Sequence, residues 1–159
     1  MKRLLAGALL LLAGCGDETV PAPAPAPGPA SYRGTLSAEL RGTADVSLIP
    51  GDDQALDVKL TLHDVDTRGL FDAAVPLRGP GRREPFPEAE SELYTAVFSL
   101  APSADPSGRC GREPVTVALS LHRRAPTTRF GGSLAAYCGP RAQGVPSWIF
   151  RLSGTLQAE

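Results

Sequence analysis

Hydrophobic and polar residues alternate with a period of two along most of the chain after residue 31. The clearest run is 56–63, in which Leu or Val stands at every even position and Asp, Lys, Thr or His at every odd one. This period places alternate side chains on opposite faces of an extended strand, one in a core and one in water. The pattern therefore predicts half-buried, antiparallel β-strands.

Eight segments show this alternation and are predicted to be strands. The fourth is the weakest, because Pro76 fits only an edge strand or a bulge. After it, residues 78–91 are rich in glycine, proline and charge and are expected to form a long loop. No segment shows a sustained 3.6-residue period with capping residues, so little helix is expected. The predicted strands are 32–41, 46–48, 56–63, 70–77, 94–100, 115–122, 130–136 and 148–156.

About eight short strands in residues 31–159 predict a single all-β domain, a barrel or a sandwich with meander connections. One internal echo bears on that choice: Gly34–Glu39 reads GTLSAE and Gly154–Glu159 reads GTLQAE. Two amphipathic strands that draw on few residue types can produce such an echo by themselves. If the first and last strands instead pair edge to edge, the sheet closes and leaves no exposed edge, which favours a barrel.

The first fifteen residues have the order of an export signal. Lys2 and Arg3 precede an apolar run, residues 4–12, that is too short to span a bilayer permanently. The run ends in Leu12-Ala13-Gly14-Cys15, which resembles the lipobox of bacterial lipoproteins. The resemblance implies that residues 1–14 are a signal peptide and that Cys15 is diacylated as the new N-terminus. The alternative is an ordinary signal peptide cut near Gly14, which leaves Cys15 as a free thiol.

Acylation of Cys15 implies an exported protein held on a membrane, because each buried CH₂ contributes roughly 0.8 kcal/mol and several chains give stable attachment. Gly16 follows the cysteine, and by family rule the lack of Asp there favours the outer membrane if the cell has one. Residues 15–30 then form the lipidated N-terminus and a linker. Its Pro-Ala repeat, 21–30, favours a polyproline II spacer of roughly 30 Å. A proline-rich ligand for a partner domain is the alternative, although the repeat lacks basic residues.

Charge disfavours nucleic acid as a partner. Removal of Lys2 and Arg3 leaves 14 basic and 17 acidic side chains, a net charge of about −3. The remaining arginines are interleaved with acidic residues, whereas binding to phosphates needs a basic stripe.

Cys110 and Cys138 form an even pair in an exported chain and are predicted to make a disulfide. Their midpoint falls where the sixth and seventh predicted strands turn, at residues 123–126. A hairpin there brings the two cysteines opposite each other near its base, unless Pro114 or a bulge shifts the register. The chain has no Cys-x-x-Cys spacing, which disfavours a metal or redox role.

Catalysis finds little support, and neither an enzyme, a cofactor nor a metal site is predicted. Both histidines, His63 and His122, occupy the polar side of their strands. Asp64 and Asp66 follow His63, but neighbouring residues of a strand point to opposite faces and do not converge on a metal. The acidic residues in or beside the predicted loop, Glu84, Glu88, Glu90 and Glu92, are expected to form a solvated charged face.

Two hypotheses for function follow. The first is a structural or protein-interaction module of the cell envelope, with a possible envelope protein as partner. The second is a carrier or sensor of a small apolar ligand in a barrel cavity. The candidate cavity or core residues are Tyr94, Phe98, Trp148 and Phe150. Phe86, between two prolines, is a candidate contact on the predicted loop, with packing onto the domain as the alternative.

Overall fold

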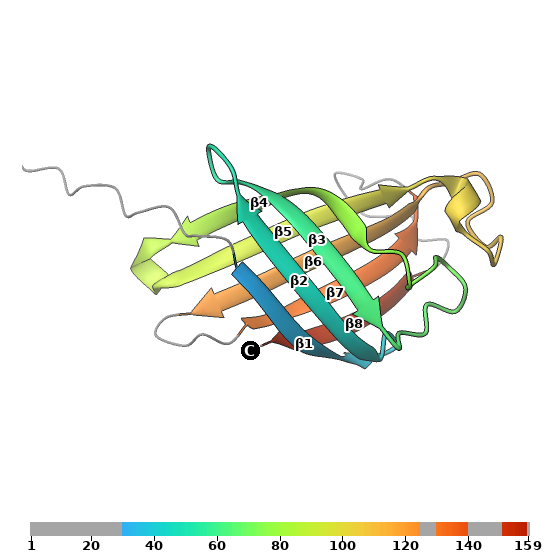
Figure 1. Ribbon diagram of the computed structural model, residues 1–159, viewed down its shortest axis with the longest axis horizontal. Coiled ribbons are helices and arrows are strands. Elements are labelled where there is room, and N and C mark those ends of the chain that lie inside the picture. The colour runs from blue at the N-terminus through green and yellow to red at the C-terminus, as the bar shows by residue number, and fades with distance from the viewer. Residues whose placement is uncertain (1–29, 125–129, 140–150, 159) are drawn as a thin grey trace, which may run out of the picture.

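The chain folds as an all-β antiparallel meander, as predicted (Figure 1). The computed structural model describes residues 30–124, 130–139 and 151–158. Each strand pairs with the next one along the chain. The eight strands are β1 (Ala30–Ala38), β2 (Gly42–Pro50), β3 (Ala55–His63), β4 (Leu77–Phe86), β5 (Ser91–Leu100), β6 (Val115–Arg124), β7 (Phe130–Cys138) and β8 (Arg151–Ala158).

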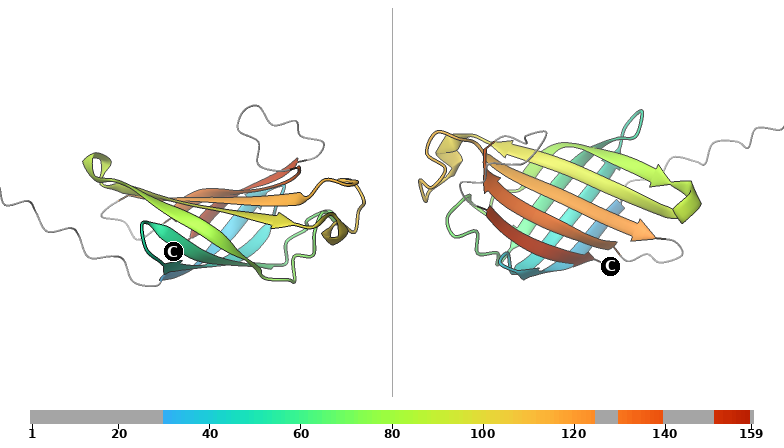
Figure 2. Two further views of the ribbon diagram at one scale, coloured as in Figure 1. Left: turned by 90° about the horizontal axis from the view of Figure 1, so that it is seen from above. Right: turned by 180° about the vertical axis from the view of Figure 1, so that it is seen from behind.

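The sheet closes into a barrel because its first and last strands pair with each other. In this pairing Leu36 of β1 lies opposite Leu156 of β8, and Ala38 lies opposite Gly154. The two echoing segments are therefore neighbours in the structure, which confirms the barrel over the sandwich. Figure 2 shows the result, with β1–β3 crossing behind β5–β8 in the right-hand view.

The inward face of the closed sheet forms the hydrophobic core. Along β3 the even positions from Leu56 to Leu62 are buried, while the odd positions are exposed or half-buried. The same alternation holds in β2, β5 and β6. Each fully buried leucine or valine contributes about 1.5–3 kcal/mol relative to exposure. The largest such side chains include Leu60, Leu121, Phe130, Leu134 and Leu156.

The fourth strand is not where the pattern predicted it. Residues 70–76 form turns and bends, and β4 instead runs through the predicted loop. Its inward positions carry Gly79 and Gly81 after Leu77, so the strand has no hydrophobic period to detect. A Cβ on Gly81 would approach Val58 Cγ2 to 2.6 Å and the Thr95 carbonyl oxygen to 2.7 Å. Neighbouring side chains thus occupy the space that an ordinary strand residue would fill.

Prolines are tolerated in β4 because the strand changes partners along its length. Its first part, Leu77–Arg82, pairs with β3, and its last part, Gly81–Phe86, pairs with β5. Pro80 lies in the stretch with β3 alone and Pro85 in the stretch with β5 alone. A residue without an N–H fits where one side of the strand has no ladder partner. The β4–β5 hairpin therefore projects beyond the barrel (Figure 1).

One end of the barrel is closed by apolar side chains and is called the sealed end below. The β3–β4 connection, residues 64–76, buries Val65, Leu70 and Phe71, and Leu40 between β1 and β2 is also fully buried. The Thr67 hydroxyl donates a 2.6 Å hydrogen bond to the Phe71 carbonyl and fixes the bend. The connection from β5 to β6 lies at the same end (Figure 1).

The predicted disulfide between Cys110 and Cys138 is present, with Cα atoms 5.1 Å apart. The hairpin register differs from the prediction, because Cys138 lies opposite Val115, the first residue of β6. Cys110 precedes β6, in the connection after β5, where its N–H donates to Asp105 at 2.7 Å. The bridge therefore ties this connection to the end of β7 instead of joining two paired strands.

Two neighbouring glycines of β7 give a sharp test of the packing. A Cβ on Gly132 would lie 2.1 Å from the Ser120 carbonyl oxygen, whereas a Cβ on Gly131 meets no atom within 4 Å. Gly132→Ala should lower the free energy of unfolding by about 1–3 kcal/mol. Gly131→Ala is the matched control, expected within about 0.5 kcal/mol of the native chain. Urea unfolding measures both, and equal effects would contradict the packing described.

Removal of the disulfide should destabilise the fold through the unfolded state. The bridge closes a segment with a sequence separation of 28, which corresponds to about 3–4 kcal/mol of loop-closure entropy. The double variant Cys110→Ser with Cys138→Ser should therefore unfold at lower urea concentration. It should also become insensitive to reductant, whereas the native chain loses stability when reduced. An unchanged midpoint in the double variant would show that the bridge contributes nothing.

Candidate functional site

The end of the barrel opposite the sealed end carries charged side chains on its inner face and is called the open end. Here β1 begins, and the β2–β3 and β4–β5 hairpins turn (Figure 1). The inward-facing positions of β6 are apolar from Val115 to Leu121, and the next inward-facing position is Arg123. In β5, Glu92 points inward like Tyr94 but lies two residues closer to the open end. In β4, Arg83 points inward like Gly79 and Gly81. Three adjacent strands thus direct ionised groups toward the same region.

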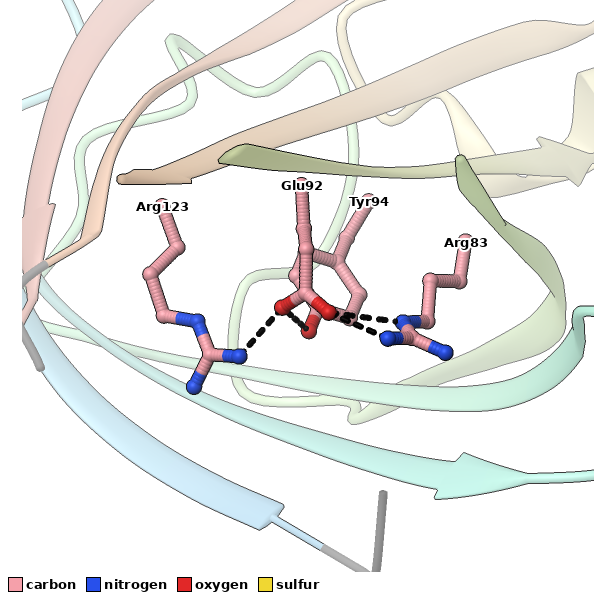
Figure 3. Close-up of polar contacts among 4 residues, drawn as sticks. All are labelled: Arg83, Glu92, Tyr94 and Arg123. Atoms are coloured by element: carbon pink, nitrogen blue, oxygen red, sulfur yellow. Dashed lines mark hydrogen bonds and ion pairs between the residues drawn. The ribbon is translucent and has the colours of Figure 1, made fainter. Parts of the chain in front are cut away.

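Glu92 is the centre of this cluster, which we call the Glu92 network: Arg83, Glu92, Tyr94 and Arg123 (Figure 3). Its Oε1 accepts a 3.0 Å hydrogen bond from Arg83 Nε and another bond from Nη2 of the same guanidinium. Its Oε2 accepts from the Tyr94 hydroxyl at 2.6 Å and from Arg123 Nη2. The Glu92 side chain is 14% exposed, against 23% for Arg83 and 36% for Arg123. Two guanidinium groups share one carboxylate, so the network carries one surplus positive charge.

The network holds its members in fixed ionisation states. Burial opposes ionisation of Glu92, but hydrogen bonds from Tyr94 and Arg83 and the charge of Arg123 outweigh it and lower its pKa. Burial, followed by the hydrogen bond to Glu92, raises the pKa of Tyr94 to about 12. Hydrogen bonding to Glu92 also raises the pKa of Arg83. None of these three groups changes its charge near neutral pH.

Aromatic rings lie between the network and the hydrophobic core. The Phe130 ring centroid is 4.1 Å from that of Tyr32 and 5.6 Å from that of Tyr94. The Arg123 guanidinium carbon lies 5.7 Å from the Phe130 centroid, a distance at which the ring face attracts a cation. Burial raises the pKa of Tyr32, although the charge of Arg123 opposes this. The rings therefore make an apolar floor beneath the charged groups.

A recess of about 210 Å³ opens beside the network and is called the mouth recess. Among the described residues its walls are mainly apolar, with one guanidinium group and two tyrosine side chains, and Ala30, the first residue of β1, lies at it too. This volume lies below the 300–1,000 Å³ of pockets for drug-sized ligands, so it suits a small molecule or one end of a longer one. The other residues that line it are Tyr32, Leu48, Pro50, Leu56, Tyr94 and Arg123.

The structure describes two of the four candidate cavity residues, and these two lie apart. Tyr94 lines the mouth recess, whereas Phe98, four residues along β5, is 3% exposed and packs in the core under Gly79. Trp148 and Phe150 lie outside the described residues, as does Cys15. Phe86 ends β4 at the tip of the projecting hairpin, before a short 3₁₀ turn at Pro87–Ala89, and is 42% exposed. It therefore lies on a strand end at the open end, and the prediction of a long loop there is wrong.

A second charged cluster lies on the outer face of the barrel. Arg33 donates to Asp45 across β1 and β2 at 2.7 and 2.8 Å, and His63 Nε2 lies 2.9 Å from the same carboxylate. Hydrogen bonds from Arg33 and His63 hold the pKa of Asp45 well below its usual range. The Arg33 side chain is 74% exposed and that of His63 43%. Solvent-exposed pairs of this kind contribute only about 0–1 kcal/mol, and the adjoining groove of about 510 Å³ is open to solvent.

The described residues contain no group of three or more His, Cys, Asp or Glu side chains placed to hold a metal ion. His63 contacts Asp45 of the neighbouring strand. Asp64 and Asp66 follow the end of β3 and lie in its connection to β4, so the alternation expected of a strand does not extend to them. Within 30–124, 130–139 and 151–158, no helix has the length and apolar character needed to cross a membrane. No protein-family model, curated protein or solved structure matches the chain.

Sequence reasoning missed the Glu92 network. Glu92 was assigned to a solvated face, yet its side chain is mostly buried, and Arg83 and Arg123 were not singled out at all. Two of these residues, Glu92 and Arg123, could have been found from the alternation of inward and outward positions along their strands. Glu92 lies two residues before the inward Tyr94, and Arg123 lies two residues after the inward Leu121. Arg83 has no such signal, because glycine occupies the inward positions before it.

Substitution of the central carboxylate tests the network. Glu92→Gln leaves two half-buried guanidinium groups without their shared counter-charge and should lower the free energy of unfolding at pH 7 by about 1.5–3 kcal/mol. The lowered pKa of Glu92 means that its carboxylate stabilises the fold above the ordinary value near pH 4.3. That contribution is lost as pH falls through the folded-state pKa. The difference between native and variant chains should therefore shrink from about pH 5 downward in urea titrations.

Glu84→Gln is the matched control for this experiment. Glu84 lies on β4 with its side chain exposed, so its substitution should change stability by less than about 0.5 kcal/mol at any pH. Equal losses in the two variants, or a Glu92→Gln loss that is unchanged in acid, would contradict the network as described.

Proposed function

We propose that this protein is a lipid-anchored module of a bacterial cell envelope whose barrel is a rigid scaffold and whose open end binds a partner. The proposal combines two supports. The lipobox-like Leu12-Ala13-Gly14-Cys15 supports the anchor, and the chemistry of the barrel ends supports the binding role. The chemistry of the barrel ends is the observation on which the proposal mainly rests.

The two ends of the barrel carry different kinds of side chain. At the sealed end the chain covers the core with Leu40, Leu70 and Phe71. At the open end it places the Glu92 network instead, although burying charges costs free energy that apolar packing does not. The fold itself therefore needs no charges at a barrel end. Their presence at the open end supports a role in recognition.

The ionisation states of the network favour binding over catalysis. A general acid or base works best when its pKa lies near the working pH. The pKa of Glu92 is lowered and that of Tyr94 is raised to about 12, so neither exchanges a proton readily near pH 7. Fixed charges with fixed hydrogen bonds are instead the means by which a surface selects a complementary partner.

The direction of the anchor also supports a role for the open end. Ala30 starts β1 at this end (Figure 1), so a linker from Cys15 would join the barrel here. A polyproline II spacer of ten residues spans roughly 30 Å. An acylated Cys15 would thus tether the open end within reach of the membrane surface and its proteins.

A carrier of a small ligand is the second candidate. The mouth recess of about 210 Å³, with mostly apolar walls, is the observation that favours it.

The anchor is tested by metabolic labelling with radioactive palmitate. The native chain should incorporate the label and fractionate with membranes, because acyl chains give stable attachment. Cys15→Ala should lose the label and the membrane association. A chain with Cys110→Ser and Cys138→Ser is the matched control and should keep the label. Equal labelling of Cys15→Ala and the native chain would exclude Cys15 as the anchor.

The binding role is tested by photo-crosslinking in intact cells. Phe86 at the open end and Val75 at the sealed end are both exposed apolar residues, 42% and 55% accessible. A photoreactive amino acid in place of Phe86 should capture a reproducible envelope partner, whereas the same residue in place of Val75 should not. Capture of the same proteins from both positions, or of none from Phe86, would refute the open end as a protein-binding surface.

A further inference from the structure

We propose that the mouth recess binds a small amphipathic organic anion, with its acidic group on Arg123 and its apolar body against the recess walls. The inference rests on the second candidate function, a carrier of a small ligand in the mouth recess, and specifies that ligand. It also changes the earlier expectation of a purely apolar ligand. A molecule with no charge would leave the surplus positive charge of the Glu92 network unbalanced.

The composition of the recess carries the first step. Among the described residues that line it, Arg123 alone is charged, and Tyr32, Leu48, Pro50, Leu56 and Tyr94 supply mainly apolar surface. A ligand that fills this space must therefore present apolar atoms along most of its length and an acceptor at one end. Carboxylates and phosphates match the planar fork of a guanidinium group.

The state of Arg123 carries the second step. A guanidinium group has five N–H donors. In the described part of the chain Arg123 donates from Nη2 to Glu92 Oε2, while Arg83 uses both Nε and Nη2 on Oε1. Arg123 is also the more exposed of the two, at 36%. It is therefore the arginine with donors available to a ligand, and Glu92 holds it at the wall.

Charge balance carries the third step. Glu92 neutralises one of the two arginines, and a monoanion at Arg123 would neutralise the other. A neighbouring recess of about 210 Å³ also contacts Arg123, but Glu90 and Glu92 line it and would repel an anion. The described residues that line the mouth recess include no carboxylate, which selects it over the neighbour.

Octanoate is a suitable probe, because it joins a carboxylate to a short apolar chain. We would titrate it by calorimetry and by amide chemical shifts into the full chain carrying Cys15→Ser, which has no acyl chains to compete. Ligand efficiencies of small molecules predict a dissociation constant of about 0.1–1 mM. Octylammonium, with the opposite charge, and acetate, without the chain, should bind at least about tenfold more weakly, since a tenfold change corresponds to the loss of one good contact.

Paired variants separate the role of Arg123 from general effects of charge. Arg123→Gln should weaken octanoate binding by about tenfold or more. Arg124→Gln removes the same charge from the next residue of β6, which is exposed, and should leave the affinity unchanged. If Arg123→Gln proves unstable, Ala30→Phe is the second variant, because it fills the recess from the first residue of β1. It should abolish binding while the Glu92 network stays intact.

Three results would overturn the proposal: equal affinity for octanoate and octylammonium, undiminished binding by Arg123→Gln and Ala30→Phe, or binding to vesicles with anionic lipid headgroups but not to free octanoate. Failure here is distinguishable from failure of the proposed function. Photo-crosslinking at Phe86 reports a protein partner whether or not the recess takes an anion.

Discussion

The pairing of β1 with β8 is the constraint on which the rest of this structure depends. An open eight-stranded meander would expose two edges, and each exposed edge is a template for pairing with another chain. Closure removes both edges and divides every strand into an inner and an outer face. It also creates two ends, which a flat sheet does not have. The Glu92 network and the mouth recess lie at one of those ends, because the middle is filled by Leu60, Leu121, Leu134 and similar side chains.

Much of this fold could be predicted from the sequence, because one face of most strands is buried. β3 and β6 alternate cleanly, and the echo at Leu36 and Leu156 pointed to the closing pair. β4 could not be found in this way. Its inward side carries glycine at 79 and 81, so the information that makes it a strand lies partly in Val58, Phe98 and the other residues that fill the space beside these glycines. The disulfide followed from the cysteine count, but its register did not, because Cys110 precedes its strand.

The candidate site shows a different limit. The alternation of β5 and β6 places Glu92 and Arg123 on the inner face. However, when charged residues follow an alternating apolar pattern, the usual interpretation is a strand end exposed to water. Whether the side chains are buried there depends on how far the hairpin projects and on which strand supplies Arg83. These are properties of the register between β4 and β5, where Glu84 pairs with Leu93 and Arg83 with Tyr94. A sequence pattern contains no such distances, so the network became visible only with three strands in place.

The Glu92 network can also have a purely structural role. The network joins β4, β5 and β6 where β4 has lost its pairing with β3, so it can pin the projecting hairpin to the barrel. That role uses all three ionised groups, because Arg83 and Glu92 both belong to the hairpin and Arg123 links them to β6. It does not account for the surplus positive charge, or for an Arg123 side chain that is 36% exposed and lines the mouth recess. A pin would be stronger without a surplus cation, whereas a binding site for an anion requires one.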